Sequence, residues 1–174
     1  MTALAQVLGG AGFEVVRFNF PYRERGAKLP DPMPVLQDCI VRVVEEVRAN
    51  RKPERLIIGG RSMGGRAASM LAADGFDCDG LLLLAYPLHP AGRPEKLRDA
   101  HLPQIKLPVL CFNGTRDELC RRDLMEKAIA GLDHWRMHWL EGAGHSFRAK
   151  DLREVAEVSQ DWLHAQAARI PARG

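Results

Sequence analysis

Short apolar segments alternating with stretches of helical periodicity constrain the fold of this chain more than any other feature. The predicted strands cover residues 13–20, 55–59, 80–85, 108–113 and 135–140. The predicted helices cover residues 2–8, 34–49, 64–73, 121–131 and 151–166. Strands that alternate with helices pair in parallel through crossover helices, and these helices cover both faces of the sheet. The alternation therefore predicts a three-layer α/β fold with a mostly parallel sheet.

Two proline-rich segments interrupt the pattern. Residues 21–34 and 86–106 contain four prolines each, which is typical of loops. Ligands of open parallel sheets bind at the carboxyl ends of the strands, and these loops could roof a site there. No separate lid domain fits within the length. Residues 167–174, beyond the last helix, are expected to form a flexible tail.

The length and composition indicate one globular domain, residues 1–174. Hydrophobic residues make up 46% of the chain and charged residues 27%, as in ordinary soluble proteins. The 25 basic and 22 acidic residues are dispersed, so the net charge of +3 forms no basic block. These features argue against nucleic acid or a membrane as a partner. No apolar run approaches the roughly 20 residues of a membrane-spanning helix.

The four cysteines show no CxxC spacing and lie in or near apolar segments. We interpret them as reduced thiols, with disulfides as the alternative. The first residues lack the basic region of a signal peptide. The expected location is therefore the cytoplasm.

The stretch Gly60-Arg61-Ser62-Met63-Gly64 matches the pattern G-x-S-x-G. It follows a predicted strand and precedes a predicted helix, which is the context of a nucleophile elbow. Such a turn lifts the serine hydroxyl above the sheet, and side chains at Gly60 and Gly64 are expected to collide across it. The alternative is a glycine-rich structural turn that happens to hold a hydroxyl. Phosphate-binding loops are excluded because neither G-x-x-x-x-G-K-[ST] nor G-x-G-x-x-G occurs here.

A nucleophilic serine needs a base and an acid that orients the base. In this kind of fold the acid and then the histidine follow the serine along the chain. Asp117 lies just past the strand predicted at 108–113, and His145 lies just past the strand predicted at 135–140. In a parallel sheet both would lie at the same edge as Ser62. The sequence thus predicts a Ser62, Asp117 and His145 constellation.

Other residues compete for these roles. Asp117 could instead cap the following helix, leaving Glu118 or Asp123 as the acid. His145 could be a loop histidine bonded to backbone. Five other histidines compete for the role of the base: His89, His101, His134, His138 and His164. The stronger rivals are His89 and His101, which lie in a proline-rich loop, whereas His138 lies inside a predicted strand and His164 on the last predicted helix.

The sequence resembles the α/β-hydrolase superfamily over nearly its whole length. More narrowly, it is similar to the small dienelactone-hydrolase-like branch that contains the testis-expressed proteins and a subunit of the NSL acetyltransferase complex. The stretches that carry the resemblance are Phe18–Tyr22, Gly59–Arg66, Tyr86–Leu88, Gly114–Asp117 and Gly142–Phe147.

The resemblance implies a serine hydrolase acting on an ester, thioester or amide carbonyl of a small acyl substrate. Ser62 would attack, His145 would take its proton, and Asp117 would hold the imidazole ring. The backbone N–H of Met63 would donate to the oxyanion, and water would then release the acyl group. No cofactor and no metal is expected. Arg61 and Arg66 could attract an anionic substrate or could form surface ion pairs.

One feature departs from the superfamily pattern. Relatives carry a central strand and an oxyanion-hole loop before the first helix, and this sequence begins inside that helix. Loss of one oxyanion donor typically costs about 10²–10³ in turnover. We expect either a truncated start or a natural short form in which strands 13–20 and 55–59 pair directly. The alternative function is a weakly active or inactive α/β-hydrolase-like binding protein.

Overall fold

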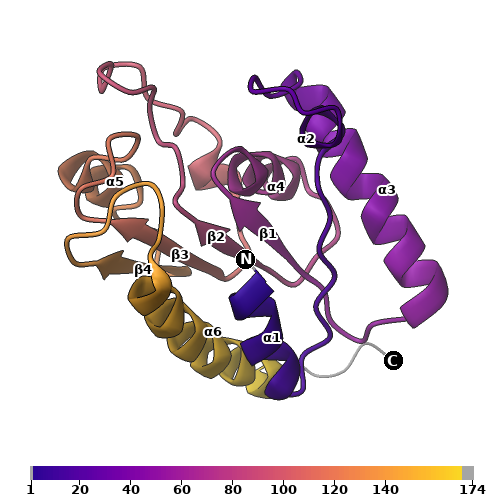
Figure 1. The fold of residues 1–174 in the computed structure, drawn as a ribbon. Coiled ribbons are helices and arrows are strands. Elements are labelled where there is room, and N and C mark those ends of the chain that lie inside the picture. The colour runs from indigo at the N-terminus through magenta and orange to yellow at the C-terminus, as the bar shows by residue number, and fades with distance from the viewer. Residues whose placement is uncertain (1, 170–174) are drawn as a thin grey trace.

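A computed structural model describes residues 2–169 of the chain (Figure 1). Its sheet has four strands in the order β1-β2-β3-β4, and every neighbouring pair is parallel. The strands are β1 (Ile57–Arg61), β2 (Gly80–Leu84), β3 (Val109–Gly114) and β4 (Trp135–Leu140). Their order in the sheet follows their order in the sequence. The predicted parallel α/β architecture is therefore confirmed.

Helices cover both faces of this sheet, which gives the molecule three layers (Figure 1). The helices are α1 (Thr2–Gly10), α2 (Pro21–Glu24), α3 (Met33–Arg51), α4 (Met63–Ala73), the 3₁₀ helix η1 (Leu102–Gln104), α5 (Arg122–Ala128) and α6 (Ala149–Arg169). One hydrophobic cluster joins the sheet to α3, α4 and α5. A second joins the opposite face to α1 and α6.

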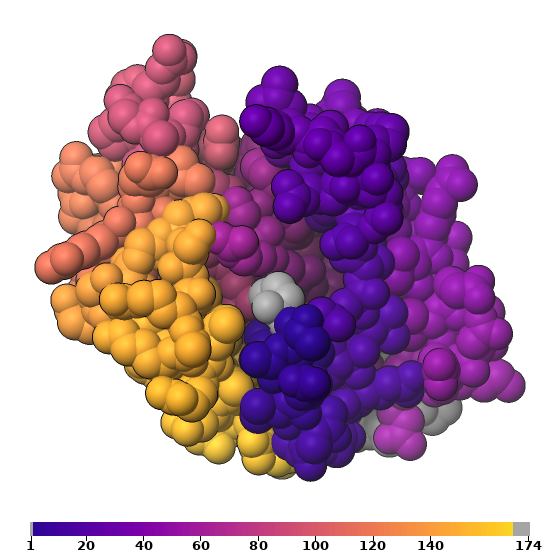
Figure 2. Space-filling model, viewed as in Figure 1, coloured from indigo at the N-terminus to yellow at the C-terminus, as the bar shows by residue number. Residues whose placement is uncertain are grey.

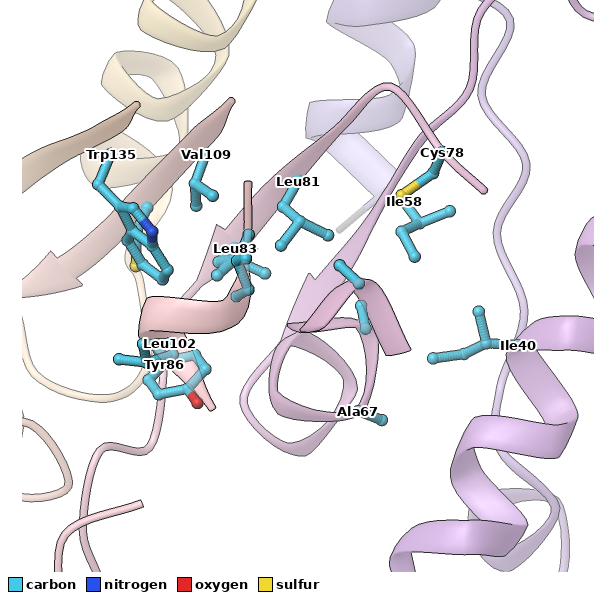
Figure 3. Close-up of a cluster of buried hydrophobic side chains, with 14 of the residues drawn as sticks. Ile40, Ile58, Ala67, Cys78, Leu81, Leu83, Tyr86, Leu102, Val109 and Trp135 are labelled. Atoms are coloured by element: carbon cyan, nitrogen blue, oxygen red, sulfur yellow. The ribbon is translucent and has the colours of Figure 1, made fainter. Parts of the chain in front are cut away.

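The four consecutive leucines of β2 show why both layers are needed. Leu81 and Leu83 pack into the cluster under α4, as Figure 3 shows, whereas Leu84 packs into the cluster under α1 and α6. Successive side chains of a strand point to opposite faces, so an unbroken apolar run is stable only where both faces are covered. Both leucines under α4 are fully buried. The run thus fixes β2 in the interior of the sheet.

Residues 13–20 do not form the predicted strand. Within the described part of the chain, no backbone N–H or C=O of residues 14–19 takes part in a hydrogen bond. β1 pairs with β2 alone, so direct pairing between residues 13–20 and β1, the alternative considered from the sequence, is also wrong. An apolar, β-branched sequence becomes a strand only beside a neighbouring strand, because the ladder hydrogen bonds join two chains.

An apolar groove of about 660 Å³ lies between residues 12–18 and β1. Leucines of α1 and valines of α3 line it, together with Ile57 and Ile58 of β1. Figure 2 shows this face of the molecule hollowed between the indigo N-terminal segment and the yellow α6. The groove runs beside β1, which is an edge strand of the sheet that the described residues form.

Smaller differences concern boundaries. The loop predicted at 21–34 contains the short helix α2, and α6 extends to residue 169, so the expected tail is helical at 167–169. The rest of that tail, residues 170–174, lies outside the described residues. Met1, where the expected truncation would begin, also lies outside them. All four cysteines are free thiols. Among the described residues, no helix combines the length and the apolar character needed to cross a membrane.

Candidate active site

Ser62 sits at the sharp turn between β1 and α4. Its backbone angles are φ 54° and ψ −122°, a region that side-chain-bearing residues rarely occupy. The turn is held by a hydrogen bond of 2.8 Å from the Ser62 N–H to the carbonyl of Leu84, at the end of the neighbouring strand. The strained turn predicted around Ser62 is therefore present.

The glycines that make this turn possible are not quite the predicted pair. A Cβ on Gly60 would lie 2.9 Å from the carbonyl carbon of Gly64, so this position requires glycine. A Cβ on Gly65 would lie 2.7 Å from the carbonyl oxygen of Gly60. A Cβ on Gly64 would meet only the ring of Phe20, at 3.3 Å. The predicted collision of side chains at Gly60 and Gly64 is therefore wrong for Gly64, and Gly65 makes the close backbone approach instead.

Asp117 lies in the turn after β3, and its side chain is fully buried. The backbone N–H of Leu119 donates to Oδ1 at 2.9 Å, and the amide of Asn113 donates to Oδ2 at 3.1 Å. The carboxylate is thus held from two sides by donors of its own strand end. Sequence reasoning missed Asn113, although its place as a buried polar residue in an apolar strand was a usable signal.

His145 lies on the loop after β4 and contacts both partners predicted for it. Its Nε2 is 2.9 Å from Ser62 Oγ, and its Nδ1 is 3.0 Å and 3.1 Å from the two carboxylate oxygens of Asp117. The side chain of His145 is about one-fifth exposed, whereas that of Asp117 is fully buried. The imidazole ring therefore joins the buried carboxylate to Ser62. The structure therefore brings together the three residues chosen from the sequence.

Close packing of two loops positions this histidine. A Cβ on Gly114 would lie 2.1 Å from the carbonyl oxygen of Ala143, so only glycine lets the histidine loop lie against the end of β3. The N–H of Arg116 donates to the same carbonyl at 2.9 Å. The acid and the base are thus fixed relative to each other by backbone as well as by side chains.

The competing acids are placed elsewhere. Asp123 is exposed and pairs with Arg121 at 2.6 Å. The hydrogen bond from Arg121 lowers the pKa of this carboxyl, which is the behaviour of a surface ion pair. Glu118 is also exposed.

The competing histidines have other contacts. His89 is buried and accepts a hydrogen bond from the N–H of Arg121. His101 contacts Ser69 at 2.8 Å, and His138 contacts Glu154 at 2.7 Å. His164 packs against the ring of Phe13. Of these four, none is hydrogen-bonded to Ser62 within residues 2–169.

The remaining predicted features surround the serine. Met63 is the first residue of α4, where backbone N–H groups have no intrahelical acceptor and the helix dipole is positive. Arg61 donates to the carbonyl and the hydroxyl of the histidine loop, at His145 and Ser146, both at 3.1 Å. In the described part of the chain, neither Arg61 nor Arg66 forms an ion pair. Across residues 2–169, no His, Cys, Asp or Glu side chains gather into a possible metal site.

A parallel sheet that presents a strained serine, a histidine and a buried carboxylate in hydrogen-bonded series at its strand ends defines the α/β-hydrolase class. Comparison with protein families agrees. The chain belongs to the family described as alpha/beta hydrolase domain, whose profile matches residues 1–171.

Solved structures share this fold. An alpha-beta serine hydrolase homologue from Coxiella burnetii matches with a TM-score of 0.75 and 23% identity, covering 93% of this chain and 74% of that one. A putative alpha/beta hydrolase from Agrobacterium tumefaciens matches with a TM-score of 0.77 and 17% identity, covering 99% and 79%. A serine hydrolase without lid from Xanthomonas campestris matches with a TM-score of 0.66 and 24% identity, covering 99% and 74%.

Proposed function

We propose that this protein is a serine hydrolase that cleaves a small ester, thioester or amide through a Ser62–His145–Asp117 triad and an acyl-enzyme. The observation that carries the proposal is the contact of 2.9 Å between His145 Nε2 and Ser62 Oγ. A base within 2.6–3.2 Å of a hydroxyl can take its proton as the oxygen attacks a carbonyl. A serine in a merely structural turn would have no need of such a partner.

In the proposed first step, Ser62 Oγ forms a bond to the substrate carbonyl carbon while its proton moves to His145 Nε2. The carbonyl electron pair moves onto the oxygen, and the tetrahedral intermediate then expels the leaving group, which takes the proton from the imidazolium. A water molecule then attacks the carbonyl carbon of the acyl-enzyme while His145 takes the proton of that water. The bond to Ser62 Oγ breaks, the acid product is released, and Ser62 regains its proton from the imidazolium. No other reactant is required.

Asp117 is proposed to hold the imidazole in the tautomer that leaves Nε2 free to accept. Its carboxylate accepts a hydrogen bond from the Nδ1–H at 3.0 Å and stabilises the imidazolium as it forms. The carboxylate already receives hydrogen bonds from Asn113 and Leu119, so it stays in place without solvent. We propose that the backbone N–H of Met63, at the positive end of α4, donates a hydrogen bond to the oxyanion and stabilises its charge.

The proposed substrates are small acyl compounds with a carboxylic ester as the leading case. Two structural neighbours support this choice: one is an esterase domain from Rhodothermus marinus, and the other is a monoacylglycerol lipase from Paleococcus ferrophilus. We also propose that the chain falls in the small dienelactone-hydrolase-like branch, because the stretches Gly59–Arg66 and Gly142–Phe147 resemble it.

A second candidate function is a weakly active or inactive binding protein. Between residues 2 and 169, β1 pairs with β2 alone and borders the groove. This arrangement favours the second candidate, because in that part of the chain no strand supports the elbow of Ser62 on its other side. Catalysis needs that elbow held within about 0.5 Å of its productive position.

Labelling and turnover separate the two candidates. A fluorophosphonate probe is expected to modify Ser62, and hydrolysis of p-nitrophenyl acetate is expected to fall at least ~10³-fold in Ser62→Ala. Ser159→Ala, which changes a buried hydroxyl of α6, serves as the matched control. A folded sample that neither labels nor hydrolyses would leave the binding protein as the function.

A further inference from the structure

Arg61 links the strand of the proposed nucleophile to the loop of the proposed base. It is the last residue of β1 and the immediate neighbour of Ser62. Its Nη2 donates to the carbonyl oxygen of His145 and to Ser146 Oγ, both at 3.1 Å. Apart from the contact between His145 and Ser62, these are the side-chain hydrogen bonds that join the two segments in the described residues.

The charge of Arg61 has no other assignment in the structure. Its side chain is exposed, yet it forms no ion pair with any carboxylate among residues 2–169. A guanidinium loses less side-chain entropy per hydrogen bond than a lysine, because its planar fork is already organised. Hydrogen bonds from a charged donor are also stronger than neutral ones. The two bonds are therefore well suited to restrain a loop.

The loop of His145 has room to move if it is released. A cavity of about 120 Å³ lies beside it, lined by Arg61, Ser146, Phe147 and Leu152. Asp117 and Ser62 hold the imidazole ring, and the backbone is held two residues upstream, where the Ala143 carbonyl accepts from the Arg116 N–H. At His145 itself, the hydrogen bond to the backbone carbonyl comes from Arg61. A misplacement of about 1 Å can cost 10²-fold in rate, so the backbone restraint has consequences for catalysis.

We propose that Arg61 is a positioning residue for the histidine loop. It touches neither the reacting atoms nor the imidazole ring, and it acts by fixing the His145 carbonyl and the Ser146 hydroxyl against the end of β1. This inference rests on the proposed hydrolase function, because its kinetic consequence requires turnover.

Arg61→Met is expected to lower kcat for p-nitrophenyl acetate about 10- to 100-fold with KM changed less than twofold. Arg61→Lys should recover part of kcat, and Ser146→Ala, which removes one acceptor, should cost less than Arg61→Met. Guanidinium ion added to Arg61→Ala should restore activity in a concentration-dependent way. Arg153→Met, which alters an exposed arginine of α6, is the control for loss of surface charge.

A second measurement does not depend on turnover. The proton on His145 Nδ1, hydrogen-bonded to Asp117, should give a downfield NMR resonance that broadens or vanishes in Arg61→Met while thermal unfolding stays unchanged. If wild type is active and Arg61→Met keeps full kcat and the resonance, the positioning role is wrong and the hydrolase stands. If wild type is inactive, the hydrolase fails, and the resonance alone decides whether Arg61 orders the loop.

Discussion

Asn113 and Asp117 are joined by a hydrogen bond of 3.1 Å from the Asn113 amide to the buried carboxylate. The same amide donates to the carbonyl of Tyr86 at 3.1 Å, and the N–H of Tyr86 donates back to Asn113 Oδ1 at 3.1 Å. One side chain therefore fastens the end of β3 to Tyr86, the second residue past β2, and orients the carboxylate of Asp117. Asn113 is fully buried, so none of these bonds can be replaced easily by water.

Asn113→Ala is expected to destabilise the protein by about 1–3 kcal/mol, because it leaves the buried Tyr86 N–H without its acceptor and removes one donor each from the Tyr86 carbonyl and the Asp117 carboxylate. Urea unfolding followed by circular dichroism measures this change. Asn50→Ala, which removes only exposed hydrogen bonds at the end of α3, should stay within about 0.5 kcal/mol of wild type. Equal effects of the two variants would contradict the role given to Asn113.

Asp117→Asn is expected to lower kcat for a short ester by about 10⁴-fold, because an amide no longer holds the histidine in the accepting tautomer. KM should change little. Asp123→Asn is the matched control, since that carboxylate is exposed and pairs with Arg121. Steady-state kinetics of both variants decides between the two carboxylates, and a larger loss in Asp123→Asn would reverse the assignment.

Gly60→Ala and Gly64→Ala should differ sharply, although both change the G-x-S-x-G pattern. At position 60 the new methyl would press on backbone at 2.9 Å, so we expect about 1–3 kcal/mol of destabilisation and loss of Ser62 labelling. At position 64 it would meet only the half-buried ring of Phe20, at 3.3 Å, which can shift. Thermal unfolding and probe labelling of both variants test this, and equal losses would show that the turn has no room at Gly64 either.

His101 should make the fold sensitive to mild acid. Burial, followed by the charge of Arg66, lowers its pKa below the ordinary value of 6.5. The unfolded chain then binds more protons than the folded one between these two pKa values, so the free energy of unfolding falls as pH drops below about 6.5. Above that pH the contribution is fully present.

Chemical denaturation at pH 7.5 and pH 5.5 measures this loss. His101→Gln should lose less stability between the two pH values than wild type does, whatever its absolute stability. His164→Gln, at an exposed histidine of α6, should behave as wild type. An unchanged pH dependence in His101→Gln would exclude His101 as the source.

The grouping of the three candidate site residues could be predicted because parallel strand ends lie along one edge of a sheet. Ser62, Asp117 and His145 each follow a strand, and this rule alone brings them to the same edge. The strand at 13–20 could not be judged in the same way. Its residues favour β structure, but a strand also needs a neighbour, and the sheet of the structure ends at β1.

Contacts between distant loops also escaped prediction. The approach of Gly65 to Gly60 depends on how tightly α4 turns away from β1, and the packing of Gly114 on Ala143 depends on two loops separated in sequence. A glycine in a sequence shows that a position can lack a side chain, whereas the structure shows which atom excludes one. The same limit applies to Asn113, because its partner Tyr86 lies beyond the end of another strand.

The backbone angle of Ser62 gives one further consequence. At φ 54° the residue that best tolerates the conformation is glycine, so Ser62→Gly removes the proposed nucleophile and relieves strain at the same time. Loss of the hydroxyl at this position can therefore raise the melting temperature, while threonine or valine would lower it. Under the proposed function, a lineage no longer selected for hydrolysis would gain thermal tolerance by drifting to glycine at position 62, so the residue found there would record whether turnover is still under selection.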